Sequence, residues 1–213
     1  VKSTFMLDAK RGDIGSTMTA YGQFAFDYCQ ADSMTIHCFF GKDSLEALRP
    51  WLNQDKSVYI VLLTSTGGGD LFQQSVAAAS STNTRPFDLI LDNIASMEQF
   101  HPNKIGLVIG AQRFAELSGS DLLRLKTLPI LMPGLGAQKG EMNSNLASWA
   151  AGHQKIHFPG SRAITGNWSL KKMDAEVLAI SSWKDYEAYI LRNIQHFATN
   201  DLEPLRKCIP TTL

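Results

Sequence analysis

Residues 3–17, with the sequence STFMLDAKRGDIGST, contain the pattern that predicts the fold. The apolar start of this stretch, residues 3–7, is typical of a short buried strand, and a helical pattern follows over residues 17–29. The same succession recurs along the chain. It predicts further strands at 34–38, 58–63, 105–109, 129–132 and 155–158, and further helices at 44–52, 71–79, 87–97, 111–117, 141–151 and 183–197.

Strands that are apolar on both faces and alternate with helices predict a parallel sheet covered by helices. Periodicity leaves open whether this sheet is a doubly wound open sheet or a closed (β/α)₈ barrel. No linker or shift in composition divides the chain, so we predict a single domain over residues 1–213. In both architectures, binding sites are built at the C-terminal ends of the strands.

Composition excludes several classes of function. Basic and acidic residues number 20 each, so the formal net charge is zero and a nucleic-acid polymer is not expected as a partner. Cys29, Cys38 and Cys208 are far apart in sequence, which is typical of reduced thiols in a cytoplasmic protein. No apolar run is long enough to predict a membrane span. The five histidines show no metal-ligand spacing, so we expect no metal site.

The end of the first predicted strand carries the strongest chemical signal. On an extended strand, residues i and i+2 point to the same side, so Asp8 and Lys10 are expected to project together as an ion pair. A second carboxylate at Asp13 would strengthen the field around the lysine, which would stay protonated and could deliver a proton. The alternative is a solvated strand end at which Asp13 caps the following helix together with Ser16 or Thr17.

The order of residues in DAKRGDIGSTMTAY, residues 8–21, resembles the D-x-K-x-x-D-I-x-x-T motif of the orotidine 5′-monophosphate decarboxylase family. Arg11, Gly12 and Tyr21 resemble the branch of that family that carries DAKRGDI. The resemblance implies a TIM (β/α)₈ barrel of which this chain holds about six of the eight β/α units. The first two units, with an Asp and a Lys of the family's charged array, are expected to be missing.

Three later segments resemble the same family in the expected order. Residues 63–69 are similar to a loop whose serine, here Ser65, is implied to bind the pyrimidine. Residues 133–138 are similar to the P-G-x-G-A-Q loop, which implies substrate contacts for Pro133 and Gln138. The segment that begins with Ser161 and Arg162 is similar to S-R-G-I, whose Arg is implied to bind the substrate phosphate. His37 stands where this branch carries a Pro-Tyr pair, and we interpret it as a wall residue rather than a base.

The resemblance implies cofactor-free conversion of orotidine 5′-monophosphate (OMP) to UMP and CO₂ in pyrimidine biosynthesis, with Asp8, Lys10 and Asp13 as catalytic residues. It also implies a homodimer in which Asp13, Ile14 and Thr17 reach the partner's site. Two alternatives stay open. One is a metal-dependent sister phosphosugar decarboxylase or aldolase on the same barrel. The other is a non-catalytic UMP-binding relative, which the missing first strands and the altered residues Thr66 and His37 would suit.

Overall fold

A computed structural model describes most of the chain, namely residues 4–37, 39–66, 73, 84–98, 101–135, 142–153, 155–160, 162–165 and 180–208. Its strands form one parallel sheet in the order β1-β2-β3-β4-β5-β6. The bounds are Met6–Arg11 for β1, Ser33–Ile36 for β2, Ser57–Leu63 for β3, Ile105–Ile109 for β4, Ile130–Leu131 for β5 and Ile156–His157 for β6. Each strand overlaps the range predicted for it.

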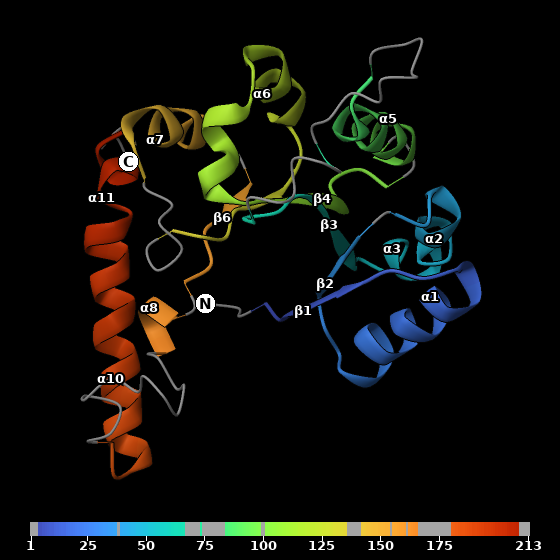
Figure 1. Ribbon diagram of the computed structural model, residues 1–213. Helices are drawn as coiled ribbons and strands as arrows, with labels where there is room; N and C mark the ends of the chain where they lie inside the picture. The colour runs from blue at the N-terminus through green and yellow to red at the C-terminus, as the bar shows by residue number, and fades with distance from the viewer. Residues whose placement is uncertain are drawn as a thin grey trace.

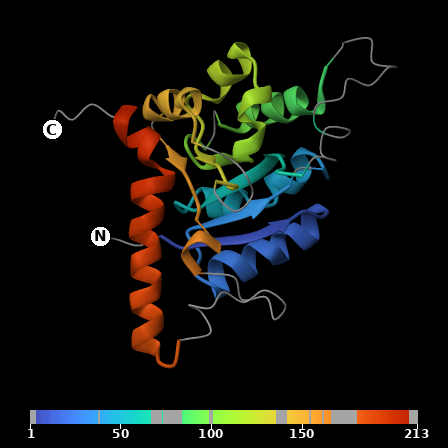
Figure 2. The same ribbon diagram turned by 60° about the vertical axis from the view of Figure 1, so that its left-hand side comes forward.

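The strand order decides between the two predicted architectures. In a doubly wound sheet the order reverses at a switch point, whereas in a barrel each strand is added beside the previous one. The sheet of the described residues follows chain order without reversal and curves, with helices along its outer side (Figures 1 and 2). The chain therefore forms part of a (β/α)₈ barrel, as the resemblance implied.

Helices follow the strands as predicted, with differences in detail. The first predicted helix is α1, Gly15–Gly22, continued by the π-helix η1, Gln23–Tyr28, and the second is divided into α2, Lys42–Glu46, and α3, Arg49–Leu52. The predicted helices at 87–97, 141–151 and 183–197 are α5, Pro86–Glu98, α7, Ser144–Ala151, and α10, Trp183–His196. The helix predicted at 71–79 lies outside the described residues, apart from Gln73.

One helix was assigned wrongly and others were missed. Residues 111–117 form the short 3₁₀ helix η3, Ala111–Glu116, and the α-helix of this unit is α6, Gly119–Leu125. Helix α6 begins at a capping box in which Ser118 and Asp121 each bond the other's backbone N–H. Three short elements were also not predicted, because one or two turns carry little periodicity: α8, Arg162–Thr165, η4, Phe197–Asp201, and α11, Glu203–Cys208.

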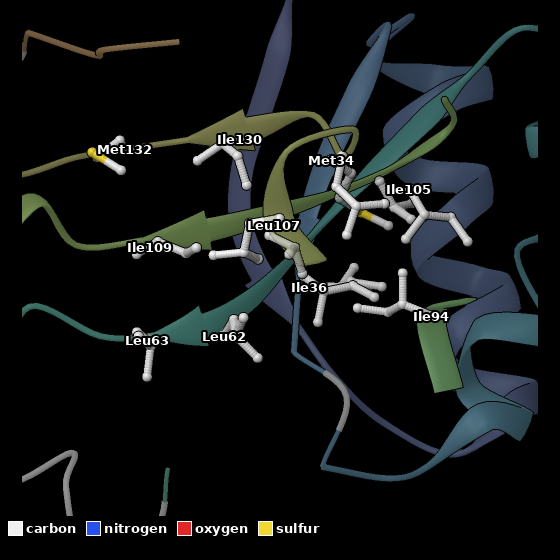
Figure 3. Close-up of a cluster of buried hydrophobic side chains, with 14 of the residues drawn as sticks. Met34, Ile36, Leu62, Leu63, Ile94, Ile105, Leu107, Ile109, Ile130 and Met132 are labelled. Atoms are coloured by element: carbon white, nitrogen blue, oxygen red, sulfur yellow. The ribbon is translucent and has the colours of Figure 1, made fainter. Parts of the chain in front are cut away.

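The main hydrophobic core lies between the sheet and its helices. Figure 3 shows Met34 and Ile36 of β2 beside Ile105 and Leu107 of β4, with Ile94 reaching them from α5. Alternate strand residues form a second, smaller cluster that contains no helix residue, made of Tyr59, Val108 and Leu131. Because successive strand residues point to opposite faces, this smaller cluster marks the inner face of the barrel wall.

The described part of the chain contains no helix that is both long enough and apolar enough to cross a membrane. Cys29 and Cys208 are free thiols, and Cys38 lies outside the described residues.

Candidate active site

Strand β1 contains the first part of the charged motif instead of ending before it. The prediction of a strand over residues 3–7 was wrong in its bounds, because the pairing of β1 with β2 continues to Arg11. Between the pairs Leu7 with Met34 and Arg11 with Ile36, four steps along β1 face two steps along β2. Strand β1 therefore bulges at Asp8 to Lys10, and bulges are a common way to direct a side chain toward a site.

Asp8 and Lys10 form the predicted ion pair, but not for the predicted reason. Lys10 has a φ of 47°, in the left-handed region, so the simple alternation of an extended strand does not apply to it. Its Nζ nevertheless donates to both carboxylate oxygens of Asp8, at 2.7 Å each. The bulge, rather than extended geometry, directs the lysine back over the aspartate.

Thr35 on β2 completes this cluster and was not singled out from the sequence. Its hydroxyl donates to Asp8 Oδ1 at 2.7 Å and accepts the backbone N–H of Lys10 at 2.9 Å. Thr35 is fully buried and pairs in register with Tyr59, which places it on the inner face of the wall. The available signal was a polar residue at an inner-face position of β2, beside the end of the charged strand.

The hydrogen bonds around Asp8 favour its ionised form. Burial raises the pKa of Asp8, but hydrogen bonds from Lys10 and then Thr35 outweigh it, so the pKa lies below the ordinary value of an aspartate. Both side chains stay about half exposed, 53% for Lys10 and 56% for Asp8. The pair is hydrogen-bonded to Thr35 on its buried side and is open to solvent on the other side. It can therefore contact a ligand bound at the C-terminal end of the barrel strands.

Asp13, Ile14 and Thr17 lie at the start of α1. Asp13 Oδ1 accepts the backbone N–H of Ile14 at 2.8 Å, and Ile14 rather than Asp13 occupies the N-cap position, where it makes no side-chain hydrogen bond, so Asp13 is not the N-cap that the alternative proposed. Ile14 occupies the N-cap position and is 60% exposed. An apolar residue is a poor N-cap, so its presence there has no explanation in the stability of this helix.

Ser65 lies where β3 ends and is held against the end of β4. The Gly110 amide donates to the Leu63 carbonyl at 2.9 Å, and a Cβ on Gly110 would lie 3.1 Å from the backbone of Ser65. The buried guanidinium of Arg113 donates to the Thr64 carbonyl at 3.3 Å, which supports the same loop. Arg113 was not recognised from the sequence, where it reads as an ordinary helix residue.

Pro133 follows β5 at the same end of the barrel. Its carbonyl accepts the Ala111 amide at 2.8 Å, and Gly134 turns the chain with a φ of 103°. Gln138 and Ser161 lie outside the described residues, and for Arg162 only the backbone, at the start of α8, is described.

The predicted residues that the structure describes follow the C-terminal ends of parallel strands and so lie at one end of the sheet, but only some of them touch. Asp8 and Lys10 are in contact, whereas no hydrogen bond or ion pair connects this pair to Asp13, Ser65 or Pro133 within the described ranges. The ring of His37 packs against Gly12 and lies 6.2 Å from the ring of Phe40, centroid to centroid, and its role as a wall residue stays a prediction. Among the described residues, no group of three or more His, Cys, Asp and Glu is arranged to bind a metal.

Comparisons with known proteins agree with the resemblance of the motif. The profile of the family described as Orotidine 5′-phosphate decarboxylase / HUMPS matches residues 2–165, which contain every predicted site residue. The chain belongs to this family. Curated orotidine 5′-phosphate decarboxylases include one from Herpetosiphon aurantiacus, 39% identical over 152 residues, which are 71% of this chain and 53% of that protein. Another, from Albidiferax ferrireducens, is 40% identical over 68% of this chain and 50% of that protein.

The chain thus spans about half the length of the curated orotidine 5′-phosphate decarboxylases that it matches. Solved structures agree with the fold at lower identity. Plasmodium berghei orotidine 5′-monophosphate decarboxylase has a TM-score of 0.63 and 24% identity, covering 92% of this chain and 57% of that one. Leishmania donovani UMP synthase has a TM-score of 0.65 and 24% identity, covering 94% and 40%.

Proposed function

We propose that this protein is an orotidine 5′-monophosphate decarboxylase, which converts OMP to UMP and CO₂ in pyrimidine biosynthesis. The observation that carries the proposal is the Asp8–Lys10 ion pair at the C-terminal end of β1, within the motif that the family shares. The curated relatives support it, because those quoted above are named for this reaction.

The proposed chemistry centres on these two charges. In the bound substrate, the bond between C6 and the carboxylate breaks, and its electron pair stays on C6 while CO₂ leaves. Asp8 faces the departing carboxylate, so its charge destabilises the ground state relative to the transition state, in which that negative charge moves away. Lys10 transfers a proton from Nζ to C6 as UMP forms, and solvent then restores the ammonium group.

The rest of the substrate would be held by residues at the same end of the barrel. Ser65 is proposed to bind the pyrimidine, Pro133 to line the site, and Gln138, Ser161 and Arg162 to hold the phosphate. An Arg guanidinium matches a phosphate in geometry, and the loops after the last two strands of these barrels are a frequent phosphate site. Binding energy from the phosphate would orient the ring for reaction.

Two identical chains are proposed to share their sites. Ile14 is apolar and exposed at the helix N-terminus, with Asp13 before it and Thr17 one turn later. A partner subunit that covered these residues would bury Ile14 and bring the carboxylate of Asp13 to the second site.

A single barrel domain over residues 1–213, the absence of its first two β/α units and a cytoplasmic location stay predictions.

The test is the absorbance change of OMP with the purified protein in excess chelator. Metal-independent loss of OMP, with UMP as product, is the expected result, and it separates this function from a metal-dependent sister enzyme. Lys126, exposed at the end of α6, provides the matched control. Lys126→Ala should keep the activity that Lys10→Ala loses. Tight binding of UMP without turnover of OMP would contradict the proposal and favour the non-catalytic relative.

A further inference from the structure

The hydroxyl of Thr35 has a defined hydrogen-bond direction. A backbone N–H can only donate, so the Lys10 amide donates to Thr35 Oγ1, and the threonine proton is then directed to Asp8 Oδ1. The resulting chain runs from the Lys10 backbone through Thr35 to the Asp8 carboxylate. Both hydrogen bonds connect β2 with β1, and they end on the two residues whose side chains form the ion pair.

We propose that Thr35 is a positioning residue for decarboxylation, which holds the Lys10 backbone and the Asp8 carboxylate in the arrangement in which their side chains meet. This inference rests on the proposed function. Thr35 does not touch the substrate in this scheme; it acts through the two residues that do.

Position and burial explain why a hydroxyl on β2 can do this. Lys10 lies on the bulge, where its amide cannot join the regular hydrogen bonds of the ladder, and Thr35 supplies the acceptor. The same hydroxyl donates a hydrogen bond to Asp8 Oδ1. The Asp8 carboxylate is therefore held by Thr35 on its buried side and by the Lys10 ammonium group on its exposed side. Because Thr35 is fully buried on β2, its own position is set by the sheet.

Ser33 provides a matched comparison on the same strand. It is also buried, it lies two residues before Thr35 and so faces the same side, and its side chain makes no hydrogen bond to Asp8 or Lys10. If decarboxylation needed only some buried hydroxyl on this face of β2, removing the hydroxyl of Ser33 or of Thr35 would have the same effect. The structure makes them different, because only Thr35 reaches the bulge.

The decisive variants are Thr35→Val, which keeps the shape but lacks the hydroxyl, and Thr35→Ser, which keeps the hydroxyl. With the purified protein and OMP, we expect Thr35→Val to lower kcat by about 10- to 100-fold with little change in KM, because it misplaces reacting groups without removing a substrate contact. Thr35→Ser should recover most of the rate, and Ser33→Ala should stay within about twofold of the wild type. Equal kcat values for Thr35→Val and Ser33→Ala would overturn the proposal.

A second measurement does not depend on turnover. In wild-type protein labelled with ¹³C, the Thr35 Cβ resonance should shift with pH at the same midpoint as the Asp8 carboxyl carbon, and Thr35→Val should raise that midpoint and speed hydrogen exchange of the Lys10 amide. A Thr35 resonance that ignores the Asp8 titration would overturn the inference, even if Thr35→Val did not fold. If the wild type did not turn over OMP, the proposed function would fail, and this titration would still decide whether Thr35 holds the pair.

Discussion

The ammonium group of Lys10 donates to both carboxylate oxygens of Asp8, at 2.7 Å each, from a backbone with a φ of 47°. A left-handed conformation is unfavourable for a residue with a side chain, and it persists only where the surroundings enforce it. Here the surroundings are the bulge of β1 and the hydrogen bond from the Lys10 amide to Thr35. Strain at the proposed proton donor agrees with a functional rather than a stabilising role.

Lys10→Ala is expected to reduce kcat by at least about 10²- to 10⁴-fold, the range that a positioned proton donor contributes. Nucleotide binding should be largely kept, because the proposed phosphate contacts lie elsewhere. Steady-state assays with OMP and calorimetric titration with UMP measure the two effects separately. A variant that lost UMP binding along with turnover would assign Lys10 to substrate binding instead.

The pH dependence of turnover should reflect the low pKa of Asp8. Burial raises this pKa, but the hydrogen bonds from Lys10 and Thr35 lower it below the ordinary value, so Asp8 stays ionised as the pH falls to about 5. We therefore expect Asp8 to cause no loss of kcat between about pH 5 and 7, and an acid limb only below the ordinary aspartate range. A profile of kcat against pH on protein verified as folded tests this, and an acid limb above pH 5 that coincided with the titration of the Asp8 carboxyl carbon, followed by ¹³C NMR, would disprove it.

Gly12 lies directly against the ring of His37. A Cβ at Gly12 would lie 2.3 Å from His37 Cε1, so Gly12→Ala must displace the ring, at a cost of about 1–3 kcal/mol of unfolding free energy. A Cβ at Gly119, the first residue of α6, would point into open space with no neighbouring atom within 4 Å, so Gly119→Ala should be neutral or stabilise by up to about 1 kcal/mol. Denaturant titrations compare the two.

A double-mutant cycle makes the Gly12 prediction specific. If the ring causes the cost, Gly12→Ala should be much less harmful in a His37→Ala background. An equal cost in both backgrounds would show that the backbone, not His37, requires the glycine.

Asp121 should stabilise the protein in a pH-dependent way. Its burial raises the pKa, but hydrogen bonds from Arg85 at 2.6 Å and from Ser118 lower it below the ordinary value. Because the folded pKa lies below the unfolded one, the stabilisation is complete above the unfolded value of about 4 and is lost as the pH falls through the folded pKa. Asp121→Asn should cost about 1–3 kcal/mol at pH 7 and flatten the acid side of the stability curve.

Asp92 is the control for this effect. It pairs with Arg124 at 2.6 Å on the surface, with 69% of its side chain exposed, so Asp92→Asn should cost less than about 1 kcal/mol. Thermal or urea unfolding at several pH values measures both variants. Equal costs for Asp121→Asn and Asp92→Asn would mean that burial of the Arg85–Asp121 pair does not matter.

Sequence alone was enough to predict, to within a few residues, where each strand of the described sheet lies and that the charged motif stands near the C-terminal end of the first. Apolar runs that are buried on both faces, such as Ile105–Ile109, are recognisable because hydrophobicity and strand propensity are local properties. The resemblance of residues 8–21 to a known motif then located Asp8 and Lys10. Element boundaries were predicted less well, and the π-helix and 3₁₀ segments had no periodic signal to distinguish them.

Only the tertiary structure shows how the strands are ordered in the sheet and which site residues contact one another. Periodicity does not contain the order of strands, so the sequence predicted a barrel only through the resemblance to a known family, and the observed strand order then distinguished it from a doubly wound fold. Likewise, the bulge that turns Lys10 and the link from Thr35 to Asp8, 27 residues apart, depend on the register of β1 against β2. Register is set by the packing of whole elements, because a pair of strands gains its energy from many contacts at once, and no local stretch of sequence specifies which residues will face one another.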